Sequence, residues 1–282
     1  MTRRIVRAVV LLALVFAALS CPVHVHGASR ESRIREALIV KLVGMIDSAY
    51  VDSVFSDPRF NIDSTIVHPR RIKAGYAFLF DSARVARGRA FLRDNRELLW
   101  RLYLVYGVEP EVLTAIFTVE TDLGNFLGDH MVPNALYTNY CLARTAKKRA
   151  QWFKYLACFL RIAQEQGWDP FSIPSSYRGA FGYPQFMSCS FAYAVDWDGD
   201  GKIDLFSVGD GLASAANYLH INGWPNGPKE KTLRTYNRGR YGTAVLEFAR
   251  LIRENVDITP APLRMDPLRP RIEVSPVLVR WP

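Results

Sequence analysis

A nearly unbroken apolar segment places the strongest constraint on the fold of this chain. Pro110 and Glu111 open it like the first turn of a helix, and apolar character then continues to Val119. A helix with so little polar surface must be covered by other elements on most of its sides. The sequence therefore predicts an interior helix that begins at Pro110, with the rest of the fold packed around it.

Other segments predict further helices, and no strand-rich region is visible. The chain has 282 residues, of which 49% are hydrophobic, enough for one large core or two modest domains. Helical spacing of apolar residues, together with Gly and Pro stop signals, predicts helices over 34–50, 94–106, 146–165, 210–221 and 241–253. In the first of these, one face collects Leu38, Leu42, Met45 and Ile46. The predicted fold class is mainly α.

The first 27 residues have the features of an export signal. Three arginines precede an apolar run from Ala8 to Leu19, which is too short to span a bilayer as a stable helix. Two processing sites compete: cleavage that leaves Ala28 as the first residue, and a loose lipoprotein box that would place a lipid on Cys21. Either site predicts a protein of the periplasm or cell envelope, and the second also attaches it to a membrane.

The chain is basic, with a formal net charge of +9 that falls to +6 when the three arginines of residues 1–27 are removed. A basic exported protein is predisposed toward anionic envelope polymers or lipid surfaces. We expect no nucleic-acid partner, because neither a basic stripe nor a nucleic-acid-binding motif is visible and export removes the opportunity.

Four cysteines show no spacing typical of a metal site: Cys21, Cys141, Cys158 and Cys189. If Cys21 is cleaved off or lipidated, three remain, and at least one of them stays unpaired. The count therefore implies no disulfide framework, and buried thiols are the expectation for all three.

A single carboxyl falls on the apolar face of the predicted interior helix. Glu120 lies four residues after Ile116 and three after Phe117, so its side chain points to the face that should be dry. Burial disfavours the charged form and raises the pKa toward the range in which the group donates a proton near neutral pH. Gly124 would end the helix within a turn and open a cleft beside the carboxyl. The alternative is an ordinary surface acid at an exposed helix end.

Residues 176–187 form a second dense region, in which two glycines and a proline are crowded among aromatic residues. This composition predicts a tight loop whose backbone approaches another group closely. Gln185 would offer both a hydrogen-bond donor and an acceptor there. A loop with a purely structural role is the alternative.

Regularly spaced acids after residue 195 predict a calcium site. Positions 1, 3, 5 and 9 of a calcium-binding loop, with Gly at position 6, are taken by Asp196, Asp198, Asp200 and Asp204. Position 12 is Ser207 rather than Glu, so Asp210 is the candidate for the missing bidentate ligand. The predicted ligands of a structural Ca²⁺ are Asp196, Asp198, Asp200, Lys202 at position 7, and Asp210. A ligand role for Asp204 stays open, and a surface turn without metal is the alternative.

These three regions together resemble the type B family of lytic murein transglycosylases. The resemblance is carried by residues 119–124 (Val-Glu-Thr-Asp-Leu-Gly), residues 179–187, the calcium loop, Asn217-Tyr218 ahead of Gly223-Trp224, and Tyr236-Asn237. It implies a lysozyme-like, mainly helical core with an EF-hand-like calcium loop and a groove for peptidoglycan glycan strands. The predicted organisation is an N-terminal helical segment (28–75), the catalytic domain that carries the resemblance (76–255) and a tail marked by repeated prolines (256–282). We expect a monomer.

The resemblance assigns Glu120 as the catalytic acid/base. It implies that further groups hold the sugar in the groove: Ser176, Gln185, Tyr218, Tyr236, Asn237 and, with a looser match, Tyr76. The chain departs from the family in three places. The stretch between Trp224 and Tyr236 is short, Ser188-Cys189 stands where a Pro-Ser pair is usual, and Asp122 adds a charge close to the catalytic position.

Glycosidases usually need two carboxylates at the bond, and this chain offers one convincing candidate. Asp122 follows Glu120 by two residues and points to a different side of the helix. This scarcity agrees with the implied reaction, in which one Glu protonates the oxygen of the MurNAc–GlcNAc β-1,4 bond. As a carboxylate it then takes a proton from the muramyl 6-hydroxyl, and a 1,6-anhydromuramyl product results. Two other classes stay open: a muramidase that uses water, and a non-catalytic peptidoglycan-binding envelope protein.

Overall fold

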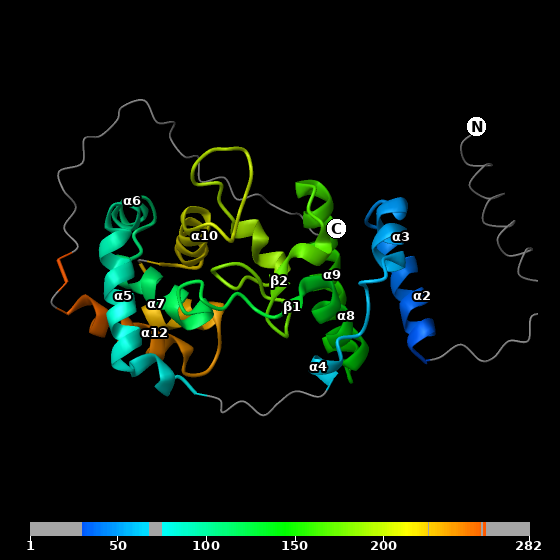
Figure 1. The fold of residues 1–282 in the computed structure, drawn as a ribbon, viewed down its shortest axis with the longest axis horizontal. Coiled ribbons are helices and arrows are strands. Elements are labelled where there is room, and N and C mark those ends of the chain that lie inside the picture. The colour runs from blue at the N-terminus through cyan, green and yellow to red at the C-terminus, as the bar shows by residue number, and fades with distance from the viewer. Residues whose placement is uncertain (1–29, 68–74, 225, 255, 258–282) are drawn as a thin grey trace, which may run out of the picture.

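Helices make up most of the structure, a computed structural model that describes residues 30–67, 75–224, 226–254, 256 and 257. The α-helices of this part are α2 (Arg30–Val43), α3 (Ser48–Ser56), α4 (Ser64–Val67), α5 (Ser82–Asp94), α6 (Arg96–Tyr106), α7 (Pro110–Thr121), α8 (Val132–Leu142), α9 (Ala146–Gln166), α10 (Val208–Ile221), α11 (Lys229–Tyr236) and α12 (Tyr241–Arg253). They are joined by the 3₁₀ helices η1 (Ala77–Phe80), η2 (Pro170–Ser172) and η3 (Ser188–Tyr193), and by the short antiparallel strands β1 (His130–Met131) and β2 (Pro174–Ser175). The predicted mainly α fold class is confirmed (Figure 1).

The helix α7 lies inside a hydrophobic core that we call the α7 core, built with α5, α6, α10 and α12 (Figure 1). It begins at Pro110, as predicted, and its middle turns are fully buried. Three threonines on this helix would be costly to bury without partners. Each donates its hydroxyl to the carbonyl four residues earlier: Thr114 to Pro110 (2.9 Å), Thr118 to Thr114 (2.8 Å) and Thr121 to Phe117 (3.1 Å). The helix therefore satisfies these hydroxyls by itself.

A second hydrophobic core, the α9 core, forms around α8 and α9 and includes residues of α2 and α3. Figure 1 shows the helices of the two cores on opposite sides of the molecule, with β1 and β2 between them. Tyr218 and Tyr236 pack against both cores, so they lie where the two meet. Between β1 and β2, His130 pairs with Ser175 and Met131 with Pro174. This pairing joins the start of α8 to the chain ahead of residues 176–187.

The single helix predicted over 34–50 is wrong, because the chain breaks there into α2 and α3. α2 ends at Val43, and Gly44 follows it. Asp47 then caps α3, since its carboxylate accepts a hydrogen bond from the Tyr50 amide (3.0 Å). The predicted apolar face nevertheless persists across the break, where Leu38, Leu42 and Ile46 are buried.

Four other predicted helices agree with the structure to within two residues at each end: α6, α9, α10 and α12. The sequence pattern does not predict α5, α8 or α11. In α8 the reason is visible, because two of its inward positions are the polar residues Asn134 and Thr138. Asn134 donates to the Arg59 carbonyl (2.9 Å), and Thr138 accepts from the Asp63 amide (2.8 Å). These partners lie more than 70 residues away, so spacing alone could not reveal that the positions are buried.

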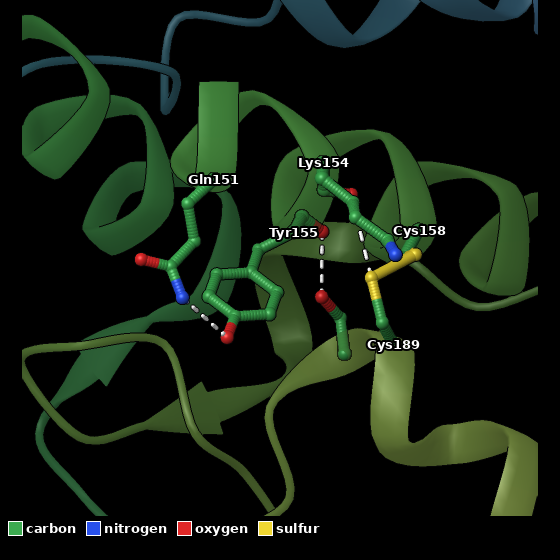
Figure 2. The surroundings of a disulfide bond; sticks show 6 residues. Gln151, Lys154, Tyr155, Cys158 and Cys189 are labelled. Carbon is green, nitrogen blue, oxygen red and sulfur yellow. Dashed lines mark hydrogen bonds between the residues drawn. A yellow bond between two sulfur atoms is a disulfide. The ribbon is translucent and has the colours of Figure 1, made fainter. Parts of the chain in front are cut away.

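A disulfide joins Cys158 of α9 to Cys189 of η3, with the two Cα atoms 5.3 Å apart (Figure 2). The expectation of buried thiols at these two positions is therefore wrong, although Cys158 is buried. An odd count of cysteines cannot exclude one bridge, and Cys141 stands half-buried outside it. Next to the bridge, the Ser188 hydroxyl donates to the Tyr155 carbonyl (2.5 Å). The segment after residues 176–187, which we call the Gly-aromatic loop, is thus anchored to α9 by the disulfide and by the Ser188 hydrogen bond.

Several expectations concern residues outside the described part of the chain: the export signal over 1–27, the lipid on Cys21, and nearly all of the tail over 256–282. Among the described helices, none is by itself long and apolar enough to cross a membrane. α6 and α7 reach that length and composition only as a pair bent by 110°.

Candidate functional site

Glu120 occupies the last turn of α7, where it is half-buried beside the α7 core. Burial raises the pKa of its carboxyl from 4.5 to about 7, and the hydroxyl of Tyr241 offsets part of that rise. A carboxyl with such a pKa exchanges a proton readily near neutral pH. The sequence prediction of a pKa shifted toward neutrality agrees with this environment.

Three tyrosines surround the carboxyl. Burial raises the pKa of Tyr76, Tyr236 and Tyr241, and in each case the negative charge of Glu120 adds to the rise. The rings form a continuous wall, because Tyr236 stacks on Tyr241 (centroids 5.8 Å apart, planes at 6°) and Tyr76 meets Tyr241 edge-on (6.2 Å). The structure therefore brings the predicted site residues Tyr76 and Tyr236 together around Glu120.

Tyr241 is a site residue that the sequence reasoning missed. The pattern of the helix over 241–253 places Tyr241 on the apolar face, which indicates a role in the core. It is fully buried, and its hydroxyl has no partner of normal hydrogen-bond geometry within the described residues, although it lies close enough to act on Glu120. Tyr241 follows the predicted site residue Tyr236 by five residues, which was the one feature of the sequence that could have indicated its role. Its ring faces the carboxyl only because α11 packs against α12.

Close contacts at two glycines pack the loop over 176–187 against α8 and Leu205, and one stacked ring packs it against α7. Gly179 and Gly182 have φ of 76° and 74°. A Cβ at Gly179 would lie 2.6 Å from the Leu136 side chain, and a Cβ at Gly182 would lie 2.5 Å from Leu205. Tyr183 stacks on Phe117 of α7 (5.0 Å, 16°), and Gly124 leaves room for this ring, since a Cβ there would lie 2.5 Å from it. The predicted close backbone approach is therefore observed, and it fixes the loop beside the turn that carries Glu120.

Hydrogen bonds and a ring contact connect Tyr236 with two further predicted sugar-binding residues, Gln185 and Tyr218, and with the loop. Tyr236 donates its hydroxyl to the Pro184 carbonyl (2.6 Å), which ties the end of α11 to the residue before Gln185. Gln185 itself has a left-handed backbone (φ 48°) and donates from Nε2 to the Gly182 carbonyl (3.1 Å). Tyr218 packs on Tyr236 with ring centroids 5.0 Å apart and donates to the Thr235 carbonyl (2.8 Å).

Ser176 and Asn237 bond to the backbone of their own segments. The Ser176 hydroxyl accepts from the Ala180 amide (3.2 Å), and the Asn237 side chain accepts from the Arg238 amide (2.8 Å). These local bonds orient the two side chains at the ends of the loop and of α11. The structure does not link either of them directly to Glu120.

Three of the predicted metal ligands converge. One carboxylate oxygen from each of Asp196, Asp198 and Asp210 lies within 4.8 Å of the other two. Asp210 is almost fully buried, and burial together with the charges of Asp198 and Asp196 raises its pKa. Carboxylate oxygens brought together in this way are the donors that a hard cation such as Ca²⁺ prefers.

The backbone of the loop is folded by hydrogen bonds to the same acids. Asp196 accepts from the amides of Gly199 (2.8 Å) and Gly201 (2.9 Å), and Asp210 accepts from those of Trp197 (2.9 Å) and Asp204 (2.7 Å). Ser207, in place of the usual Glu, caps α10 by accepting from the Asp210 amide (3.1 Å). Asp210 is thereby fixed at the start of α10, facing the loop.

Asp200 and Lys202 lie on the exposed side of the same loop. The Asp200 carboxylate accepts from the Lys202 amide (2.8 Å), and Asp200 is not part of the group of three converging acids. Asp204 accepts from the Phe206 amide (2.8 Å). The oxygen set therefore fits a calcium loop at three of the five predicted ligands.

Comparison with known proteins gives a consistent picture. A family model described as "Transglycosylase SLT domain" matches residues 46–249. The chain is 39% identical over 145 residues to the membrane-bound lytic murein transglycosylase B of Escherichia coli (strain K12). That match covers 51% of this chain and 39% of the relative, so the chain spans well under half of the relative's length.

Two solved structures from Pseudomonas aeruginosa have a similar fold. The soluble lytic transglycosylase SltB1 superposes with a TM-score of 0.70 at 26% identity, covering 78% of this chain and 98% of that one. SltB3, crystallised in complex with NAG-anhNAM-pentapeptide, gives a TM-score of 0.62 at 30% identity, covering 72% of this chain and 55% of its own. The lysozyme-like, mainly helical fold expected from the sequence agrees with these neighbours.

Proposed function

Because the chain belongs to the transglycosylase SLT domain family, we propose that it is a peptidoglycan lytic transglycosylase. It cleaves the MurNAc–GlcNAc β-1,4 bond of the glycan strand and forms a 1,6-anhydromuramyl end. One observation carries the proposal: the carboxyl of Glu120, which Tyr76, Tyr236 and Tyr241 surround, has a pKa of about 7. The complex of the relative SltB3 with an anhydromuramyl fragment supports the product.

Glu120 acts twice in this reaction. With a pKa of about 7 it is about half protonated near neutral pH, so it gives its proton to the glycosidic oxygen as the bond to the anomeric carbon breaks. The resulting carboxylate takes the proton of the muramyl 6-hydroxyl, whose oxygen bonds to the anomeric carbon. Glu120 is thereby protonated again, and no water is consumed.

The surrounding residues bind and orient the sugar. Tyr218 and Tyr236, where the two cores meet, and Tyr76, against the α7 core, offer flat rings for pyranose rings. Ser176, Gln185 and Asn237 supply polar groups at the rim. The hydroxyl of Tyr241 lies close enough to Glu120 to lower its pKa, so it favours the carboxylate that the second step needs.

Asp122, the second acid that a hydrolytic muramidase would need, is held in ion pairs with two arginines. Asp122 accepts hydrogen bonds from Arg84 (3.0 Å) and Arg87 (2.9 Å). A carboxylate held by two guanidinium groups is a poor base for water. An internal hydroxyl, which acts at an effective molarity reaching about 10⁵ M, then has the advantage.

A structural Ca²⁺ held by Asp196, Asp198 and Asp210 is part of the proposal. These acids come from one loop and the start of α10, so a cation between them would join the two. Asp200 and the Lys202 carbonyl are the remaining proposed ligands. The ion is assigned no part in the chemistry.

A location in the periplasm or cell envelope is also proposed, with the protein acting as a monomer. The disulfide supports an oxidising compartment, because such bonds persist outside the cytosol. The leader-like residues 1–27 support export, and a lipid on Cys21 would attach the protein to a membrane.

Product analysis tests the proposed reaction. Purified peptidoglycan is digested in ¹⁸O-labelled water, and the muramyl ends are examined by mass spectrometry. We expect unlabelled ends that are one water lighter than hydrolysis products, and the matched Glu120→Gln variant should lose about 10²–10⁴-fold or more of the activity. Labelled, reducing muramyl ends would identify a muramidase instead.

A further inference from the structure

The backbone next to Glu120 has an uncommon conformation. In the described part of the chain, three residues other than glycine have φ in the left-handed region: Asp122 (50°), Leu123 (60°) and Gln185 (48°). Side chains disfavour this region, and such residues persist where the surroundings hold them in place. All three belong to the two segments that carry Glu120 and Gln185. Asp122 and Leu123 follow Glu120 within three residues.

The side chain of Asp122 is held from α5. Arg84 donates from Nε to Oδ1 (3.0 Å), and Arg87 donates from Nη2 to Oδ1 (2.9 Å) and Oδ2 (3.0 Å). The Asp122 and Arg84 side chains are only 23% and 25% exposed, so water competes weakly for these charge-assisted bonds. The left-handed residue after α7 is therefore fixed by three hydrogen bonds.

Arg84 also holds the segment that carries Tyr76. Its Nη1 donates to the Phe78 carbonyl (3.0 Å) and to Asp81 (2.9 Å), and its guanidinium lies 4.9 Å over the Phe78 ring. Phe78 belongs to η1, which begins directly after Tyr76. One guanidinium thus contacts the chain two residues after Glu120 and the chain two residues after Tyr76.

We propose that Asp122 and Arg84 are positioning residues for the Glu120 site, forming a brace that fixes the end of α7 against the segment of Tyr76. This inference rests on the proposed function. Neither residue contacts the reacting atoms. The brace sets the position of the Tyr76 ring relative to the Glu120 carboxyl. It also gives a role to the charge of Asp122, which departs from the family pattern.

Two variants separate the brace from simple helix stabilisation. Asp122→Asn keeps the size and the tolerance for left-handed backbone but loses the charge. Arg84→Lys keeps the charge but loses the planar fork that reaches both partners. The matched control is Arg101→Gln, which removes an exposed ion pair with Glu97 (2.6 Å) on α6.

Steady-state cleavage of peptidoglycan is the first measurement. Both brace variants should lower kcat between about 10-fold and 100-fold with KM changed less than about twofold, and the control should match the wild type. Combined with Tyr76→Phe, Asp122→Asn should lower kcat by less than the product of the two separate effects, because both act on one geometry. Wild-type kcat in both brace variants, or fully multiplicative losses, would overturn the proposal.

Titration of Glu120 by NMR is the second measurement, and it does not depend on turnover. A loosened brace admits water, so the pKa of Glu120 should fall from about 7 toward 4.5 in Asp122→Asn and also in the charge-conserving Arg84→Lys. An unchanged Glu120 pKa in both variants contradicts the brace. A wild-type protein that cuts no glycan would sink the proposed function, and this titration would still decide the positioning role.

Discussion

At the scale of single residues, Glu120 couples chemistry to stability. Its pKa is about 7 in the folded protein, against 4.5 for the ordinary group, because burial penalises the charged form. Between these two pH values the unfolded chain has lost the proton while the folded protein keeps it. Ionisation therefore favours the unfolded state, and the stability present below pH 4.5 is lost as the pH rises through about 7.

Replacing the carboxyl should remove this loss. Glu120→Gln is expected to have a larger free energy of unfolding than the wild type above pH 7, by roughly 3 kcal/mol. Below pH 4.5 the difference should vanish, since both states of the wild type are then protonated. Urea unfolding of the two proteins at pH 4 and pH 8 measures it, and an equal difference at both pH values would contradict the shifted pKa.

The hydroxyl of Tyr241 should also change the pKa of Glu120, in the direction opposite to burial. Its hydroxyl lowers the pKa of Glu120, so Tyr241→Phe is expected to raise that pKa and to move the alkaline limb of kcat/KM to higher pH. Tyr106→Phe, which removes another buried hydroxyl from the α7 core, serves as the control and should leave the limb in place. The pH profile over pH 5–9 decides it, and an unmoved limb in Tyr241→Phe would remove Tyr241 from the site.

At the scale of elements, the Gly-aromatic loop depends on supports at both ends. β2 precedes it, and the segment after it is anchored to α9 by the Cys158–Cys189 bond. Figure 2 shows Cys189 and its bridge alongside Lys154 and Tyr155 of α9. A cross-link between residues 31 positions apart restricts the unfolded chain and holds η3 on the α9 core.

Loss of this bridge should lower stability. Cys158→Ala with Cys189→Ala is expected to reduce the free energy of unfolding by roughly 3 to 4 kcal/mol on the chain-entropy estimate. Reductant should destabilise the wild type and leave the double variant unaffected, which provides the control. Thermal unfolding with and without reductant tests this, and a wild type indifferent to reductant would speak against the bond.

Local signals predicted the elements better than they predicted the site. The start of α7 and the ends of α9 and α12 follow from Pro, Gly and apolar spacing, so they could be predicted from neighbouring residues. The orientation of Tyr241 and the pairing of Cys158 depend on packing between distant segments, which no local pattern contains. Glu120 was predictable because its distance from Ile116 fixes its face, whereas the ion pairs of Asp122 arise from α5, a helix that the pattern does not predict.

At the scale of the whole molecule, calcium should stabilise the fold by joining the loop that carries Asp196 and Asp198 to the start of α10. A ligand bound only by the folded state stabilises it by about 2.7 kcal/mol at one hundred times its dissociation constant. Calcium is therefore expected to raise the thermal midpoint of the protein, and Asp198→Ala should blunt the rise. Asp94→Ala, on another helix, is the control, and equal melting in calcium and in chelator would exclude the site.

The two cores meet at Tyr218 and Tyr236, and this arrangement has a consequence for the lifetime of the protein. Opening at that junction would expose both cores together with the site, and such openings are the usual entry points for proteases. On the proposed function, a glycan strand lying across the junction would oppose the opening. The protein would then resist degradation while uncut substrate surrounds it and become vulnerable once the substrate is spent, so its abundance would follow the amount of wall left to cut.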